Sequence, residues 1–319
     1  MINSQNMLEH PAVTAWMEVQ PESQVPQRVE LIEESDSSQM AVRLFGIGLG
    51  ESNIIAKRSL PDITRIERLL YEEILPNLSL PTVHYYGTAH EKESEFSWLF
   101  LEDVSGERYQ PNNTEHRIAA AKWLGSMNTY TEHLAKSAQL PLRDTDHYMK
   151  LLRNSRKKIQ SFRSNPGIDA DKIQLLNVME THYEDLDRIW EQFRIICNGN
   201  PNTLVHGDFI SKNVAVRIIE NRITILPFDW EKAGWGSPAE DISRVDIPTY
   251  WNRVQGSWPE LSIGALNRLA AVGKVFRCAV YLDWISTQLE ERTIEQSMYH
   301  LQRCKIWLTD LINSSPWQN

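Results

Sequence analysis

The sequence has few cysteines and no long apolar run. Its 319 residues include three cysteines, Cys197, Cys278 and Cys304, which are far apart and form no CxxC pair. This spacing predicts neither a disulfide framework nor a zinc site. No apolar run reaches the ~18 residues that a membrane span needs, and the first residues show no basic stretch followed by an apolar one. We therefore expect a reduced, cytoplasmic protein with no membrane partner.

The sequence also lacks an excess of basic residues. It has 33 Lys and Arg against 42 Asp and Glu, a net charge of −9. This balance argues against general nucleic-acid binding and against adhesion to anionic membranes. It leans weakly toward a neutral or cationic substrate, although an acidic, soluble surface is the simpler explanation. With 41% hydrophobic residues, the chain is long enough for two domains or one bilobal unit.

The first third of the chain is rich in β signals. About 25 polar residues with three prolines come first, and we interpret them as a short helix or arm. Runs rich in apolar and β-branched residues then predict five strands, and a 3.6-residue period predicts one helix among them. The strands are expected at 28–34, 40–48, 53–58, 83–88 and 98–104, and the helix from Pro61 through Leu75.

The remainder is mainly helical. Apolar residues that recur every three or four positions predict helices over 114–135, 173–193, 269–284 and 294–311. Only 205–231 carries a clear β signal among them. We therefore predict an α+β chain in two parts, 1–104 and 105–319, without internal repeats.

The stretch from Val205 to Asn213, VHGDFISKN, contains an aspartate and an asparagine five residues apart. A second aspartate, Asp229, follows 21 residues after Asp208, at the end of a hairpin-like segment. Two carboxylates and an amide suit phosphoryl transfer, because one carboxylate aligns and deprotonates an acceptor hydroxyl while the other groups hold Mg²⁺. Asp208 is our candidate catalytic base, and Asn213 and Asp229 are candidate Mg²⁺ ligands.

A lysine and a glutamate in the β-rich part complete such a site. Lys57 ends the third expected strand, and Glu67 follows ten residues later on the next helix. A lysine held by a glutamate presents a fixed positive charge to the α- and β-phosphates of a nucleotide. By itself, Lys57 would be a solvated strand-end lysine. Glu72 and Glu73 share the helix, but Glu67 lies toward its apolar side.

Two further residues are candidates for supporting the loop that carries Asp208. His206 can fix the tight turn at Gly207 by a hydrogen bond. Asp241 follows a Gly-Ser-Pro turn, so it could cap a helix or accept hydrogen bonds from backbone N–H groups of the loop. The sequence leaves both roles of Asp241 open.

The segment Trp98–Val104 ends the β-rich part with a strand and two acidic residues. Its backbone C=O and N–H groups could bind an adenine ring. Its acidic side chains are equally well explained as the ordinary end of a strand.

Taken together, these motifs make the chain resemble the aminoglycoside phosphotransferase-like small-molecule kinases, relatives of choline kinase and of the eukaryotic-type protein kinases. The HGDxxxxN loop of that family is matched by His206–Asn213. Its second motif is matched by Phe228–Ile242, which reads FDWEKAGWGSPAEDI. Lys57 and Glu67 fit its strand lysine and helix glutamate, and Leu101–Asp103 fits its linker.

The resemblance implies a bilobal protein-kinase-like fold, with a small antiparallel β-sheet lobe that binds nucleotide and a larger helical lobe that carries the catalytic loop and the substrate site. It implies ATP (or GTP) and Mg²⁺ as cofactors and a small-molecule hydroxyl as acceptor. Residues implied to contact the nucleotide, besides Lys57 and Glu67, are Ser37, Ser38, Glu102, Asp103 and Val104.

The sequence departs from the family pattern in places. The expected nucleotide loop, 35–39, lacks glycines, unlike the G-x-G-x-x-G of protein kinases. The glycine cluster Gly46–Gly50 is too close to Lys57 for that role, and we expect a bent strand and turn there. Leu124–Asn128 stands where the family often has Leu-His. These departures leave the choice between ATP and GTP open.

The function that the sequence favours is ATP-dependent transfer of phosphate to a hydroxyl of an amino sugar, antibiotic or related metabolite. A catalytically silent nucleotide-binding protein of the same fold is the alternative. A protein Ser/Thr kinase is a weaker one, because Asp229 leads to Asp241 without room for a long activation segment. Residues that could wall the acceptor pocket, unless they belong to the core, are Tyr250, Trp251, Trp258 and Trp284.

Overall fold

The computed structural model describes residues 9–35, 39–91, 94–104, 106–134, 139–289 and 292–318. The chain forms two compact units. The first combines Met1–Gln110 with Ile210–Lys232, and the second combines Pro111–Phe209 with Ala233–Asn319. The boundary expected at residue 104 therefore lies inside the first unit, and the segment 210–232 clusters with that unit although it is remote in sequence.

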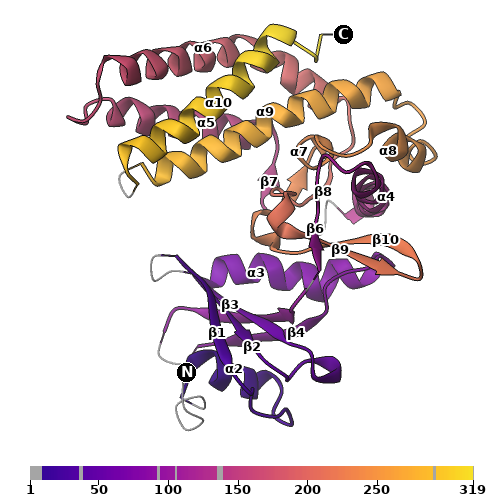
Figure 1. Ribbon diagram of the computed structural model, residues 1–319. Helices are drawn as coiled ribbons and strands as arrows, with labels where there is room; N and C mark the ends of the chain where they lie inside the picture. The colour runs from indigo at the N-terminus through magenta and orange to yellow at the C-terminus, as the bar shows by residue number, and fades with distance from the viewer. Residues whose placement is uncertain are drawn as a thin grey trace. The chain divides into compact units, whose positions relative to one another are not determined.

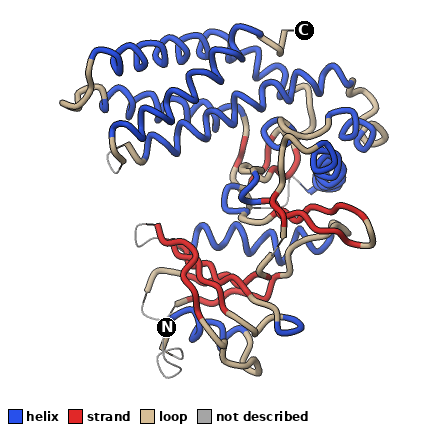
Figure 2. Tube along the Cα trace, viewed as in Figure 1, coloured by secondary structure: helices blue, strands red, loops and turns tan. Residues whose placement is uncertain are grey.

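The first unit contains a five-stranded antiparallel sheet in the order β1-β2-β3-β5-β4 (Figures 1 and 2). Side chains alternate between its two faces. On β3, Ile54 and Ala56 are fully buried on one face, whereas Lys57 belongs to the other. The strand bounds are β1 Val29–Ser35, β2 Gln39–Leu44, β3 Ile54–Ser59, β4 Tyr85–His90 and β5 Ser97–Glu102.

Helix α2, Pro11–Val19, covers one face of this sheet. It begins after His10, whose Nδ1 accepts a hydrogen bond from the N–H of Ala12 at 3.2 Å. Trp16 is buried and meets the ring of Phe100 on β5 edge to face, with 5.4 Å between centroids. The short helix interpreted from the sequence is thus present, and it supplies much of the core of the first unit.

Helix α3, Pro61–Leu69, follows β3 and buries Glu67. It begins at Pro61, a residue well suited to the first turn of a helix. The sequence predicted one helix through Leu75, but the chain continues as a π-helical turn over Leu70–Ile74 and a 3₁₀ turn over Leu75–Asn77. Pro76 lies in that last turn, where it cannot donate a helical hydrogen bond.

The segment 210–232 contributes the hairpin of β9, Val214–Ile219, and β10, Arg222–Pro227. Strand β6, Glu107–Arg108, pairs with β9 and completes a three-stranded sheet. Val214 pairs with Pro227 at the open end of the hairpin. Consequently the residues just before β9 and just after β10 lie side by side.

The second unit is mainly helical (Figure 2). Helix α9 packs against α5, α7, α8 and α10. A small sheet has the strand order β7-β11-β8, and β11 belongs to the motif of residues 228–242. The helices are α4 Thr114–Thr131, α5 Thr145–Phe162, α6 Ala170–Asn198, α7 Ala239–Ile242, α8 Ile247–Val254, α9 Ile263–Thr287 and α10 Ile294–Ser314; the strands are β7 Leu142–Arg143, β8 Thr203–Val205 and β11 Gly234–Gly236.

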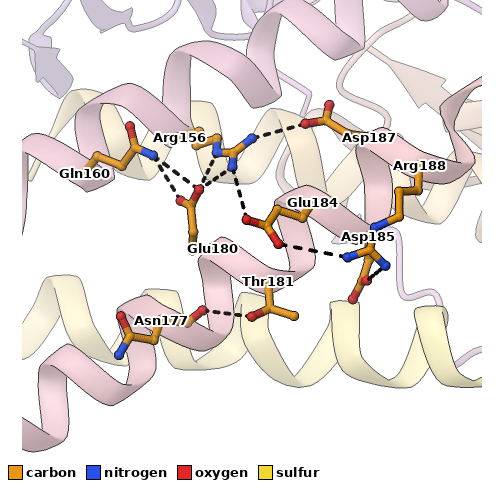
Figure 3. Close-up of polar contacts among 9 residues, drawn as sticks. All are labelled: Arg156, Gln160, Asn177, Glu180, Thr181, Glu184, Asp185, Asp187 and Arg188. Carbon is orange, nitrogen blue, oxygen red and sulfur yellow. Dashed lines mark hydrogen bonds and ion pairs between the residues drawn. The ribbon is translucent and has the colours of Figure 1, made fainter.

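An ion-pair network joins α5 to α6 (Figure 3). The Nε of Arg156 donates to Oε1 of Glu180 at 2.8 Å, and its Nη1 donates to Oδ2 of Asp187 at 3.1 Å. Gln160 donates to the same glutamate, and Glu184 lies 3.9 Å from the guanidinium. One arginine therefore connects three acidic residues of α6 to α5.

The predicted fold class is confirmed: an antiparallel sheet with a helix in the N-terminal part, and a helical C-terminal part. Within the described ranges, no helix is both long and apolar enough to cross a membrane.

Candidate functional site

Lys57 is surrounded by three carboxylates. Its Nζ lies 3.1 Å from Oε2 of Glu67 and 3.3 Å from Oε2 of Glu231, and it also donates a hydrogen bond to Asp229. Strand β3, helix α3 and the chain after β10 supply these groups. Glu67 is fully buried, whereas Glu72 and Glu73 of the same helical segment are exposed. The structure thus selects Glu67 as the partner of Lys57, as predicted.

The cluster shifts the pKa of its members. Burial alone would lower the pKa of Lys57, but Glu67, Asp229 and Glu231 outweigh it and hold this pKa well above its ordinary value. Burial raises the pKa of Glu67, and the neighbouring carboxylates act in the same direction against the attraction of Lys57. Lys57 is therefore a permanent cation.

The charges of this cluster do not balance. Because burial raises the pKa of Glu67 to about 7, the cluster keeps an excess of at least one negative charge when Asp229 and Glu231 are ionised, and a divalent cation could neutralise it. Asp229 also has a positive φ of 65°, a conformation that costs a non-glycine residue free energy and often marks a functional site. The charge excess and the backbone strain both point to Asp229 as a ligand-binding residue.

The hairpin of β9 and β10 brings Asn213 beside Asp229. The N–H of Phe228 donates to the carbonyl of Asn213 at 2.9 Å, one step beyond the Val214–Pro227 pair. Asn213 is only 2% exposed. The two predicted metal ligands are thus brought together at the open end of β9 and β10.

These groups line a pocket of about 320 Å³ within the first unit. The Lys57 cluster, Asn213 and other charged side chains line part of it, and apolar side chains line the rest. A pocket that combines apolar walls with a few polar groups is typical of a small-molecule site. Apolar side chains on its walls are Ile32, Met40, Ala41, Ile55, Val83, Leu101, Val104 and Phe228.

Glu102, Asp103 and Val104 lie along one edge of this pocket. The N–H groups of Glu102 and Asp103 already donate to the carbonyls of His84 and Asn53. The N–H of Val104 makes none of the hydrogen bonds found among the described residues. Of the backbone donors suggested by the sequence, that of Val104 is the one available to a ligand.

The acidic side chains at this edge are bound to arginines. Glu102 lies 2.6 Å from a guanidinium nitrogen of Arg217, and Asp103 accepts from Nε of Arg43 at 2.7 Å. Because each carboxylate is paired, these side chains stabilise the strand ends. This agrees with the alternative that the sequence left open for them.

Asp208 belongs to the second unit, in the loop after β8. Gly207 has a φ of 73°, so the tight turn depends on glycine. The N–H groups of His206 and Gly207 donate to the two carboxylate oxygens of Asp241, at 2.7 and 3.2 Å. Asp241 lies inside α7, whose N-cap is Pro238. The helix-cap alternative for Asp241 is therefore wrong.

A second buried carboxyl lies next to Asp241. Glu240 is 1% exposed and accepts a hydrogen bond from the hydroxyl of Tyr148 at 3.0 Å. Burial raises the pKa of Glu240 to about 8, and Asp241 and Asp208 act in the same direction, whereas Arg277 opposes them. We conclude that Glu240 holds its proton near neutral pH.

The structure brings together seven of the predicted site residues around one pocket, namely Lys57, Glu67, Glu102, Asp103, Val104, Asn213 and Asp229. Ser37 and Ser38 lie outside the described residues. The position of Asp208 relative to this pocket stays a prediction. Sequence analysis missed Glu231, although its place two residues after Asp229 in the FDWE motif was a usable signal.

Of the aromatic residues that could wall an acceptor pocket, two are core. Tyr250 is fully buried and donates to Asn128, and Trp258 is 6% exposed and donates to Glu132. Trp251 donates to a backbone carbonyl and is half-buried. Trp284 is 39% exposed.

A family model described as the phosphotransferase enzyme family matches residues 24–266. The chain belongs to this family. Comparison with curated proteins returned no match to the sequence. Family membership confirms the resemblance drawn from the two motifs and makes the protein a phosphotransferase.

Solved structures of small-molecule kinases share the fold. A GDP complex of an aminoglycoside 2′-phosphotransferase is 14% identical with a TM-score of 0.64, covering 94% of this chain and 98% of that one. Spectinomycin phosphotransferase with ADP and spectinomycin is 11% identical with a TM-score of 0.63, covering 97% and 98%. Choline kinase from Cryptosporidium parvum is 13% identical with a TM-score of 0.58, covering 91% and 92%. The protein-kinase-like fold is thereby confirmed.

Proposed function

We propose that this protein transfers the γ-phosphate of ATP or GTP to a hydroxyl group of a small molecule. The observation that carries the proposal is the cluster of Lys57, Glu67 and Asp229 beside Asn213 in one pocket. A fixed cation for phosphates and oxygen ligands for a metal in the same pocket are the parts that phosphoryl transfer requires. The solved structures with ADP and GDP support a nucleotide as the donor.

The residues of the pocket fit a nucleotide. The apolar walls, among them Ile55, Leu101 and Phe228, suit a flat base. The free N–H of Val104 offers a hydrogen bond to it, and Lys57 offers its charge to the phosphates. The pocket residues can therefore contact both the base and the phosphates of a nucleotide.

The residues also fit Mg²⁺. No group of three His, Cys, Asp or Glu side chains arranged to hold a metal occurs in the described part of the chain. Mg²⁺ in kinases needs only one or two protein oxygen ligands, because phosphate oxygens and water supply the others. Asp229 and Asn213 provide one carboxylate and one amide oxygen, and the bound ion neutralises charge on the phosphates.

Asp208 is our proposed base for the acceptor hydroxyl. Its loop is fixed by the two hydrogen bonds to Asp241, and the side chain is 7% exposed. A carboxylate held in one place can orient the acceptor oxygen and accept its proton. Positioning and charge neutralisation would supply most of the rate acceleration.

The alternatives are less well supported. A protein Ser/Thr kinase needs an activation segment, but here 3₁₀ turn Trp230–Lys232, β11 and α7 occupy the chain between Asp229 and Asp241. A silent nucleotide-binding protein would have no need for the acid, amide and lysine together. Family membership and these residues favour catalysis.

The test compares Asp208→Asn, Asp229→Asn and the exposed control Asp146→Asn. With ATP, Mg²⁺ and a panel of hydroxyl compounds, both site variants should lose more than about a thousandfold in transfer rate. Asp208→Asn should keep its affinity for ATP, measured by calorimetry, because the base does not hold the nucleotide. Transfer at the wild-type rate in either site variant would contradict the proposal. Nucleotide binding without transfer to any acceptor would favour the silent alternative.

A further inference from the structure

One face of α9 contacts the loop of Asp208 and then continues toward α10. Nη1 of Arg277 donates to the carbonyl of Phe209 at 3.2 Å. Tyr281 and Trp284 follow four and seven residues later, so all three lie on one face of the helix. At ~1.5 Å per residue, Trp284 is about 10 Å beyond Arg277. The face that begins at the loop of Asp208 therefore continues for about two helical turns to Trp284.

Beyond Arg277 this face carries a cluster of aromatic rings from α9 and α10. Tyr281 and Trp284 stack with 5.6 Å between centroids and an interplanar angle of 24°. Trp307 lies 5.6 Å from Tyr281, and His300 accepts or donates a hydrogen bond at 2.6 Å with the hydroxyl of Tyr281. Trp284 is 39% exposed. The ring of Trp284 is thus partly open to solvent on this face.

Two arginines extend over these rings. The guanidinium of Arg292 lies 4.6 Å from the centroid of Trp284 and within 2.7 Å of Nε2 of His300. That of Arg303 lies 5.2 Å from the centroid of Trp307. Neither arginine lies within ion-pair distance of a carboxylate among the described residues. Glu290 and Glu291 are not among these residues. Among the described residues, the cluster therefore presents two cations that form no ion pair.

Among the described residues, the charges that act on His300 are positive, although the chain carries a net charge of −9. Partial burial lowers the pKa of His300, and the charges of Arg292 and Arg303 lower it further. No acidic group opposes them among the causes of this shift. A cationic acceptor would be repelled here, whereas an anionic one would be attracted.

We propose that the cluster of Tyr281, Trp284, Arg292, His300, Arg303 and Trp307 binds the phosphoryl acceptor and selects one that carries an anionic group beside a ring. The rings would stack on the body of the acceptor, and the arginines would bind its carboxylate or phosphate through charge-assisted hydrogen bonds. This inference rests on the proposed function. The net charge of the chain had instead favoured, weakly, a neutral or cationic substrate.

The first experiment compares two ligands that differ by one charged group. These are 4-nitrophenyl glucuronide, which is anionic, and 4-nitrophenyl glucoside, which is neutral; the 6-phosphate of the glucoside separates phosphate from carboxylate. By calorimetry, the wild-type protein should bind at least one anionic ligand about tenfold more tightly than the neutral one. Equal binding of all three, or tighter binding of kanamycin or choline, would overturn the proposal.

The second experiment locates the preference. Arg303→Gln, an exposed position that should fold normally, and Arg292→Gln should each reduce the preference for the anionic ligand to about threefold or less. Arg188→Gln, an exposed arginine of α6, is the matched control and should leave it unchanged. An unaltered preference in both cluster variants would contradict the inference.

The third measurement separates this inference from the proposed function. Asp208→Asn should bind the anionic ligands as the wild type does, because the base is outside the cluster. Charge-dependent binding without phosphate transfer by the wild type to any ligand would support the cluster and count against the proposed kinase activity. Transfer to neutral or cationic acceptors alone would support the proposed kinase activity and count against the role of the cluster.

Discussion

Nζ of Lys57 lies 3.1 Å from Oε2 of Glu67, a side chain that is completely buried. A buried carboxylate is costly unless it has a charged partner. The pair therefore persists because each group compensates the other, and it fixes the ammonium in the pocket. Asp229 and Glu231 contact the same ammonium, so the position of one lysine depends on three elements of the first unit.

Replacing Glu67 by Gln should weaken nucleotide binding. The change keeps the shape of the side chain but removes one charge-assisted interaction with Lys57, which is worth about 1.5–3 kcal/mol. We expect the KM for ATP to rise about tenfold or more. Steady-state kinetics measure this, and Glu72→Gln, an exposed glutamate that pairs with Arg68, is the control. A normal KM in Glu67→Gln would show that the pair has no part in nucleotide binding.

Replacing Glu231 by Gln should raise the requirement for Mg²⁺. Its carboxylate also accepts from Nε2 of Gln39 at 3.1 Å, and the variant keeps an acceptor there. The excess negative charge around Lys57 falls by one, so a divalent cation is bound less strongly. We expect the Mg²⁺ concentration for half-maximal activity to rise about tenfold. Glu220→Gln, at the exposed turn of the same hairpin, should not change it.

A Mg²⁺ titration at saturating ATP separates two roles of Glu231. If it serves only to position Lys57, the KM for ATP changes and the Mg²⁺ requirement does not. That outcome would contradict the charge-balance argument.

Much of the first unit could be predicted because its signals are local. The third β-like run placed Lys57 at a strand end, and the apolar side of the following helix indicated Glu67. The FDWE motif offered a signal for Glu231, but its contact with Lys57 depends on how the 3₁₀ turn after β10 is placed. The π-helical end of α3 also left no sequence signal.

In the second unit, sequence analysis missed the helices α5 and α8. The buried face of α5 includes Tyr148 and Ser155 between charged residues, so its apolar period is interrupted. This face is buried because α9 packs on it, where the rings of Tyr148 and Phe276 stack with 4.0 Å between centroids. The aromatic and arginine cluster escaped prediction for a similar reason, since it exists only where α9 and α10 pack together.

Arg156→Gln should destabilise the second unit through the α5–α6 network. The pairs are partly exposed, so the loss should be about 1 kcal/mol, a shift of about 2 °C in Tm. Burial alone would raise the pKa of Glu180, but hydrogen bonds from Arg156 and Gln160 outweigh it and lower this pKa. The stabilisation is therefore present above the ordinary pKa of glutamate and is lost as pH falls through the lowered one.

Thermal unfolding followed by circular dichroism between acidic and neutral pH measures this effect. The difference in Tm between wild type and Arg156→Gln should shrink below about pH 4. Arg153→Gln, an exposed position on the same helix, should match the wild type throughout. A difference that does not depend on pH would mean that Arg156 stabilises by packing alone.

Replacing Glu240 by Gln should stabilise the protein in a pH-dependent manner. Glu240 faces Tyr148 on α5, Arg277 on α9, and the carboxyl groups of Asp208 and Asp241. Burial raises its pKa from the ordinary value near 4.5 to about 8. Between these values the folded protein keeps a proton that the unfolded chain releases, so the free energy of unfolding falls as pH rises. At pH 8 the loss is on the order of a few kcal/mol.

The amide introduced by Glu240→Gln cannot ionise and still accepts the hydrogen bond from Tyr148. The variant should therefore match the wild type near pH 4.5 and become progressively more stable than it toward pH 8. Urea unfolding at a series of pH values measures the difference, and Glu260→Gln, an exposed glutamate, should show none. If Glu240→Gln is instead less stable at every pH, the carboxyl is ionised in the folded protein and is held by Arg277 as an ion pair.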